Sequence, residues 1–178
     1  MLLNSGLLFL FAAGFTGSTG GSTAIQDIVT WTYSVTTATG KSPVTYSTTD
    51  LAAVTSGANL RTFLWSGFPD GRGTILDASA AGNSVTFTVN IAQPGIYDIY
   101  YTSKDYNTRG TTQLAINGTN TGPVTNQYIE TELYSGFDLG NFNFAAAGNY
   151  SFKFTVTGKN AFSSGYSLAF DQLVLTPQ

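Results

Sequence analysis

The residues best suited to binding chemistry lie in one short segment, Lys104-Asp-Tyr-Asn-Thr-Arg109. In this segment the ring of Tyr106 is flanked by the polar side chains of Asp105, Asn107 and Arg109. Glycan sites stack the apolar face of a sugar on an aromatic ring while amides and charged groups bind its hydroxyls, and they are mostly preformed. We therefore identify this loop as a candidate glycan-binding site. The alternative for Tyr106 is that its ring packs against the core or its rim.

Other segments also place an aromatic side chain beside polar ones. Asn160 and Phe162 lie next to a predicted turn, and we include both among the candidate glycan-binding residues. Trp65 follows Arg61 closely, and a further segment contains Tyr128 and Tyr134. For each of these aromatic side chains, including Tyr106, packing against the core or its rim is favoured over ligand binding, most strongly for Trp65.

The sequence offers little for catalysis. It contains no His and no Cys, which removes their nucleophile and base chemistry, disulfides and zinc-type sites. Glu130 and Glu132 are the only glutamates, and on a predicted strand they would share one face about 7 Å apart. That spacing is within the range of an inverting glycosidase pair. Exposed strand faces commonly carry such pairs and no cleft-forming insertion is evident, so we expect no enzyme activity.

Charge excludes a further class of partner. The 178 residues include 10 acidic and 7 basic side chains, which gives a net charge of −3. The bases are spread from Lys41 to Lys159, so no patch can neutralise a phosphate backbone and nucleic acid is not expected as a partner. Charged residues make up 10% of the chain, against about 25% in typical soluble domains. Thr, Ser and Asn are therefore expected to cover the outer faces.

The elements that must position these loops are predicted to be strands. Apolar and polar residues alternate through much of the chain, and turn signals such as Pro94-Gly95 and Asn117-Gly118 separate the alternating segments. The clearest segments are 29–35, 85–89, 97–101, 114–116, 150–156 and 166–170, and weaker ones lie at 44–46, 60–65, 124–133 and 137–144. About ten short strands of this kind predict an all-β fold, an antiparallel β-sandwich or jelly roll.

The amino-terminal segment is apolar and needs a separate explanation. Residues 2–15 are rich in Leu, Phe and Ala and run into a Gly/Ser/Thr stretch. They are too short to span a bilayer, which takes about 20 apolar residues. We favour an anchor packed in an oligomer or larger particle over a signal sequence, since a basic start is missing, and over a strand of the domain core. The assembly residues of this anchor would be Leu3, Leu7, Leu8, Phe9, Phe11 and Phe15.

Three parts follow along the chain. Residues 1–26 form the anchor or signal-like segment, residues 27–43 a strand and a linker, and residues 44–178 the β-sandwich. A mature protein that begins near residue 15 or 25, detected by mass spectrometry, would contradict the anchor interpretation.

Several segments of the β-sandwich resemble a known family in their order. Gly82-Asn-Ser-Val-Thr-Phe-Thr-Val-Asn90 is followed by Pro94-Gly-Ile-Tyr-Asp-Ile-Tyr-Tyr101, and Arg109-Gly by Gln113-Leu-Ala-Ile-Asn-Gly118. Together with 148–160 and 164–177, these segments resemble the galactose-binding-like β-sandwich of family 6 and family 35 carbohydrate-binding modules. The resemblance covers residues 60–177 and implies glycan binding.

Two departures from the family pattern concern its ligands. Ala169 stands where family 6 members commonly place a sugar-binding Asn, two residues before Asp171. The structural calcium of the family also uses early glutamates, and none precedes Glu130. The resemblance leaves Asp171 as the candidate calcium ligand, and the alternative is that its carboxylate bonds to local backbone. We expect no other cofactor.

We therefore expect a non-catalytic structural, decoration or adhesion protein. It would display the β-sandwich outside the cell on a larger assembly, such as a phage virion surface or an extracellular filament, through its own amino-terminal segment. Polysaccharide binding would be a secondary role. The alternative is a secreted carbohydrate-binding protein whose apolar start is a signal peptide.

Overall fold

The computed structural model describes residues 41–178, and these residues form twelve strands. The predicted strand at 29–35 and the predicted assembly residues lie outside this range. Within residues 41–178, no helix is long and apolar enough to cross a lipid bilayer. In chain order the strands are β1 (Val44–Ser47), β2 (Ala53–Ser56), β3 (Leu60–Leu64), β4 (Arg72–Leu76), β5 (Ser84–Ile91), β6 (Gly95–Asp105), β7 (Gly110–Ile116), β8 (Thr119–Asn126), β9 (Leu133–Phe144), β10 (Gly148–Lys159), β11 (Leu168–Phe170) and β12 (Gln172–Pro177).

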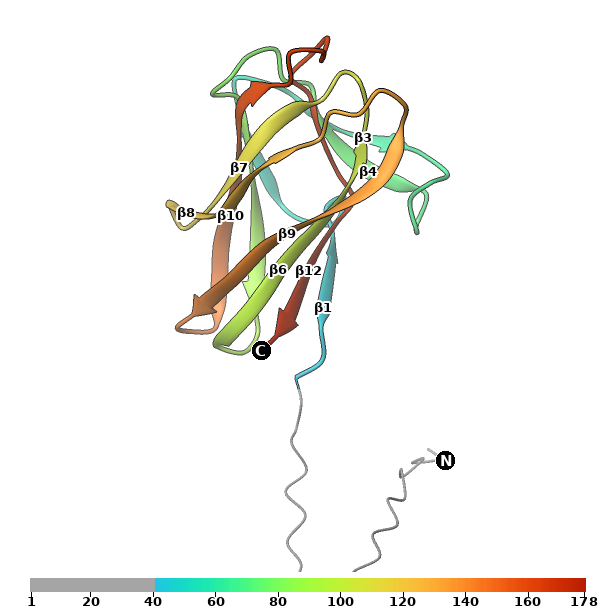
Figure 1. The fold of residues 1–178 in the computed structure, drawn as a ribbon. Coiled ribbons are helices and arrows are strands. Elements are labelled where there is room, and N and C mark those ends of the chain that lie inside the picture. The colour runs from blue at the N-terminus through green and yellow to red at the C-terminus, as the bar shows by residue number, and fades with distance from the viewer. Residues whose placement is uncertain (1–40) are drawn as a thin grey trace, which may run out of the picture. The chain divides into compact units, whose positions relative to one another are not determined.

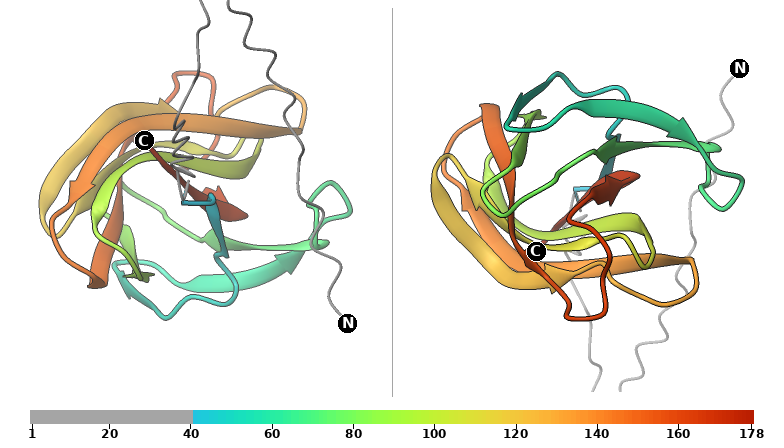
Figure 2. Two further views of the ribbon diagram at one scale, coloured as in Figure 1. Left: turned by 90° about the horizontal axis from the view of Figure 1, so that it is seen from below. Right: turned by 90° about the horizontal axis from the view of Figure 1, so that it is seen from above.

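The strands form three antiparallel sheets. A four-stranded sheet has the order β1-β12-β6-β9, and a five-stranded sheet has the order β2-β5-β10-β7-β8. The short sheet β11-β4-β3 lies beside them, and its β3 and β4 are seen at the right of Figure 1. Views along the strands in Figure 2 show the sheets curving around a shared interior. The prediction of an all-β antiparallel sandwich is therefore confirmed.

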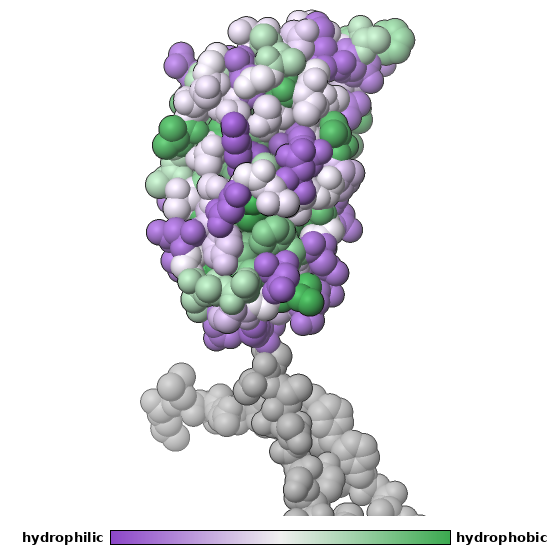
Figure 3. Space-filling model, turned by 90° about the vertical axis from the view of Figure 1, so that its left-hand side faces the viewer, coloured by the Kyte–Doolittle hydropathy of each residue, from purple (hydrophilic) through white to green (hydrophobic). Residues whose placement is uncertain are grey.

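Alternating residues of the two large sheets fill this interior. Val85, Phe87 and Val89 on β5 are fully buried, while the Thr residues between them and Asn90 face outward. The ring of Phe154 on β10 lies 5.4 Å from Tyr101 on β6, which joins the two sheets through aromatic packing. The outer face in Figure 3 is largely polar or near neutral, with hydrophobic residues singly or in small groups. Neutral polar residues cover much of this surface, which accounts for the low fraction of charged residues in the chain.

One predicted strand differs from the structure. The segment 124–133 was expected to be extended throughout, but β8 ends at Asn126 and β9 begins at Leu133. Gln127 turns inward and is fully buried, which takes the chain out of the sheet. Glu130 and Glu132 consequently lie in a loop, and the expectation that they share one strand face is wrong.

Candidate functional site

Three loops that carry candidate residues meet at one end of the sandwich, the upper end in Figure 1. They connect β6 to β7, β8 to β9 and β10 to β11. Backbone hydrogen bonds join them: the N–H of Tyr106 donates to the carbonyl of Gln127 at 3.1 Å, and the N–H of Ser164 donates to the carbonyl of Asn107 at 2.9 Å. The structure thus brings the segments 104–109 and 160–164 together, as one ligand site would require.

The predicted residues differ in how much of their side chains reaches solvent. Tyr106 is 36% exposed and Phe162 is 82% exposed, so both rings are accessible. Asn107 is half-buried. The side-chain oxygen of Asn160 accepts a hydrogen bond from the N–H of Phe162 at 3.0 Å, so it holds the turn that presents this ring.

Asp105 and Arg109 lie beneath the loop, each only 5% exposed. The hydroxyl of Ser103 donates to Asp105. Arg109 donates through Nε to the carbonyl of Lys104 at 3.1 Å and through Nη1 to Ser167 Oγ at 2.8 Å. These contacts favour a role for Asp105 and Arg109 in holding the loop rather than in touching a ligand.

Burial dominates the ionisation of this pair. It raises the pKa of Asp105 to about 6, although hydrogen bonds from Ser103 and Ser135 and the charge of Arg109 act in the opposite direction. Burial also lowers the pKa of Arg109 to about 10, and the charge of Asp105 opposes this change. Arg109 is therefore still charged at neutral pH, while Asp105 gains its proton at mildly acidic pH.

The raised pKa of Asp105 should make the free energy of unfolding depend on pH. Because the folded state binds this proton more tightly than the unfolded state, the stabilisation is complete below pH 3.8 and is lost as the pH rises through about 6. The loss should be at most about 3 kcal/mol. Urea unfolding between pH 4 and 7 should show this slope in the native protein and a flatter one in Asp105→Asn. Identical slopes would show that Asp105 has its ordinary pKa.

Lys104 lies between two aromatic rings at the edge of this loop end. Its Nζ is 4.6 Å from the ring centroid of Trp65 and 6.0 Å from that of Tyr106. Such distances allow cation–π attraction to both rings. We call Trp65, Lys104 and Tyr106 the aromatic platform. The sequence had placed Trp65 with Arg61, but Arg61 instead forms an ion pair with Asp77 at 2.8 Å.

The Trp65 ring of the platform rests on further aromatic side chains. Trp65 packs edge-on against Phe68, with ring centroids 5.0 Å apart, and Tyr134 lies 6.4 Å away. Tyr134 is itself fixed, because its hydroxyl donates to Asp171 Oδ2 at 2.6 Å. Trp65 thus stands on a packed base formed by the β3–β4 turn and the start of β9, which suits a preformed site.

Sequence reasoning missed Gln127, which holds the loops from within. This fully buried side chain accepts a hydrogen bond from the N–H of Ala169 at 2.9 Å and donates to the carbonyl of Ala169 at 3.0 Å. Gln127 thus satisfies both backbone polar groups of Ala169. No sequence signal separates this glutamine from any other polar residue after a strand.

The surroundings of Asp171, the candidate calcium ligand, offer few free oxygen atoms to an ion. The carboxylate is fully buried, and its Oδ2 already accepts hydrogen bonds from Tyr134 and from Thr102 Oγ1 at 2.6 and 3.1 Å. Only Oδ1 has no hydrogen-bond partner among the described residues. Burial raises the pKa of this carboxyl group.

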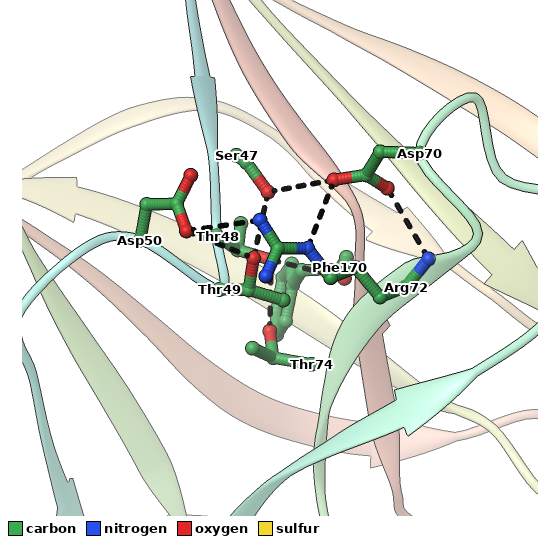
Figure 4. A network of polar contacts seen from close by, with 8 residues as sticks. All are labelled: Ser47, Thr48, Thr49, Asp50, Asp70, Arg72, Thr74 and Phe170. Carbon is green, nitrogen blue, oxygen red and sulfur yellow. Dashed lines mark hydrogen bonds and ion pairs between the residues drawn. The ribbon is translucent and has the colours of Figure 1, made fainter.

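Asp70, whose charge acts on Asp171, and Asp50 are both engaged by a cation of the protein itself. Arg72 lies between Asp50 and Asp70, at 3.3 and 3.5 Å, and Ser47 also donates to Asp70 at 3.3 Å (Figure 4). Beneath them, Thr74 donates to Thr48 at 3.0 Å. Residues 41–178 contain no group of three acidic side chains that could hold a metal ion. Because calcium needs six to eight oxygen ligands, this donor set does not fit it.

We therefore expect chelation to leave thermal stability unchanged. A structural ion present at 100 times its Kd would add about 2.7 kcal/mol, which would raise the Tm of a chain of this size by about 5–10 °C. Melting curves of the full chain should coincide in EDTA and in millimolar calcium. A calcium-dependent rise of several degrees would show that Asp171 does contribute to an ion site.

Known proteins with a similar structure support the fold described above. Neither a protein-family model nor a curated protein matches the sequence. Among solved structures, Paenibacillus xanthan lyase matches with a TM-score of 0.72 and 29% identity over 75% of this chain. The match spans only 13% of the lyase, so this chain corresponds to a small part of that enzyme.

Two isolated modules match over nearly their whole length. A family 35 carbohydrate-binding module from Clostridium thermocellum gives a TM-score of 0.52 with 20% identity, over 78% of this chain and 100% of the module. The CBM36-1 domain of a xylanase from the hindgut metagenome of Trinervitermes trinervoides gives 0.52 with 15% identity, over 76% and 98%. At these identities the likeness concerns the fold. Residues 41–178 form a β-sandwich like that of carbohydrate-binding modules.

Proposed function

We propose that this β-sandwich is a non-catalytic carbohydrate-binding module that binds a glycan at its loop end. The observation that carries the proposal is the aromatic platform, in which Trp65 and Tyr106 flank Lys104 beside accessible polar groups. Aromatic rings supply the stacking surface, and the Lys104 ammonium and neighbouring carboxylates supply hydrogen bonds to hydroxyls. The fold shared with the family 35 and CBM36 modules supports the same function.

The positions of the two glutamates support a role without catalysis. Both lie in the β8–β9 loop, and Glu132 is in contact with Lys104 at 2.5 Å. An inverting glycosidase needs two free carboxyl groups that flank a bond and a water molecule. A glutamate already paired with a lysine is poorly placed for that task.

The wider setting of the module follows from what it would bind. A polysaccharide-binding module acts where polysaccharide is, so we place it outside the cell. Display on a phage virion or extracellular filament through residues 1–26, and self-association through the same segment, rest on residues outside the described range and stay predictions. Secretion with a cleaved signal peptide is the alternative.

Binding of the full chain to immobilised polysaccharides tests the proposal. A panel of glucans, xylan, mannan, galactan and carboxylated polymers should retain the folded protein saturably on at least one member. The same protein unfolded in urea should not be retained, since the platform requires the fold. Absence of retention on every polysaccharide would contradict the proposed function.

A further inference from the structure

An ion pair is built into the aromatic platform. Nζ of Lys104 lies 2.5 Å from Oε2 of Glu132, and the two side chains are 16% and 46% exposed. With Trp65 and Tyr106 also close to the ammonium, an incoming anion would have to compete with the Glu132 carboxylate for Lys104. This pair therefore differs from an ion pair on open surface, because it lies where a bound sugar would rest.

The carboxylate of Glu132 is kept charged in this position. Hydrogen bonding from Lys104 is the main reason that the pKa of Glu132 lies below its usual value, and hydrogen bonding from Trp65 acts in the same direction. The contact with Lys104 thus fixes Glu132 at the edge of the platform. At neutral pH it carries a full negative charge next to the position of the ligand.

Two arginines at this end are also engaged, and Lys159 lies apart from the platform, over the ring of Tyr166 at 5.0 Å. Arg61 is paired with Asp77 at 2.8 Å, and Arg109 is buried with Asp105 nearby. Among the described residues, Lys104 is the cation in contact with the platform rings, and Glu132 balances it. The platform is thus electrically neutral as a unit, within a chain whose net charge is −3.

We infer that Glu132 is a specificity-determining residue that restricts the platform to uncharged glycans. The inference rests on the proposed function and adds the ligand class. A neutral sugar can accept hydrogen bonds from Lys104 and donate to Glu132 without breaking the pair. The carboxylate of a uronic acid would have to displace Glu132 and would then lie beside a like charge, which is unfavourable.

The test compares charge-removing variants of the full chain. Glu132→Gln frees Lys104, and Glu130→Gln is the matched control, since it removes the same charge from an exposed residue of the same loop. Binding is measured at low salt to polygalacturonate and alginate, and to the neutral polysaccharides of the panel. We expect Glu132→Gln to bind polygalacturonate at least about tenfold more tightly than the native protein, with no gain for Glu130→Gln.

The outcomes separate this inference from the proposed function. If Glu132→Gln keeps its neutral ligand but gains nothing on carboxylated polymers, the inference fails and the proposed function stands. An equal gain in Glu130→Gln would show that the effect comes from net charge alone, and this result would also overturn the inference. The inference would also be overturned if the native protein bound polygalacturonate as tightly as it binds neutral glycans. If no form binds any polysaccharide, the proposed function fails and the inference fails with it.

Discussion

Replacing Tyr106 by alanine should abolish retention on the polysaccharide that the native protein binds. Tyr106 is accessible and forms one side of the platform, so its ring can stack on a sugar. Removing an aromatic anchor at the centre of a binding site commonly costs 2 kcal/mol or more, which is about a thirtyfold increase in Kd. Affinity electrophoresis in gels that contain the polysaccharide measures this loss directly.

Tyr100 provides a matched control for this experiment. It is a tyrosine of equal exposure, 36%, but it lies on β6 rather than in the loop. Tyr100→Ala should bind as the native protein does, and both variants should melt near the native temperature. Loss of binding in Tyr100→Ala with Tyr106→Ala unaffected would move the site to the outer face of the four-stranded sheet.

Replacing Gln127 by alanine should destabilise the fold strongly. The change leaves the N–H and carbonyl of buried Ala169 without partners and opens a cavity beside them. Each unsatisfied buried group costs about 1–3 kcal/mol, so we expect a total loss of about 3–5 kcal/mol. For a chain of this length that loss should lower the Tm by about 6–20 °C.

Gln113 on β7 is the control for this effect. Its side-chain amide also donates to backbone carbonyls, those of Leu114, Thr121 and Gly122, at 3.0, 3.0 and 3.1 Å. It is only half-buried, so water can replace the lost bonds and Gln113→Ala should cost about 1 kcal/mol. Equal losses in the two variants would show that burial of Gln127 adds nothing.

Local periodicity was sufficient to predict most of the sandwich. The alternation at 85–89 and 150–156 corresponds to β5 and β10, which pair directly in the five-stranded sheet. β4 was missed because four of its five residues are buried, so its sequence does not alternate. The end of β8 was missed because the inward turn of Gln127 depends on the backbone of Ala169, which is distant in sequence.

The candidate site was predictable only in part, for a similar reason. The loop around Tyr106 could be recognised because aromatic and polar residues are adjacent there. Trp65 joins it only because the β3–β4 turn lies near Lys104, about which the sequence carries no local signal. Asp105 and Tyr106 are neighbours but differ in burial, because Asp105 ends β6 and faces inward while Tyr106 begins the loop and reaches solvent.

Fluorescence of Trp65 gives the most direct test of a glycan site on the platform. The chain has two tryptophans, so Trp31→Phe leaves Trp65 as the sole indole reporter. Titration of this variant with an oligosaccharide of the retained polysaccharide should change the Trp65 emission saturably, with the same Kd as calorimetry. The account predicts that Tyr106→Ala in the same background abolishes the change. Glycan binding by calorimetry with constant Trp65 emission would contradict a site on the aromatic platform.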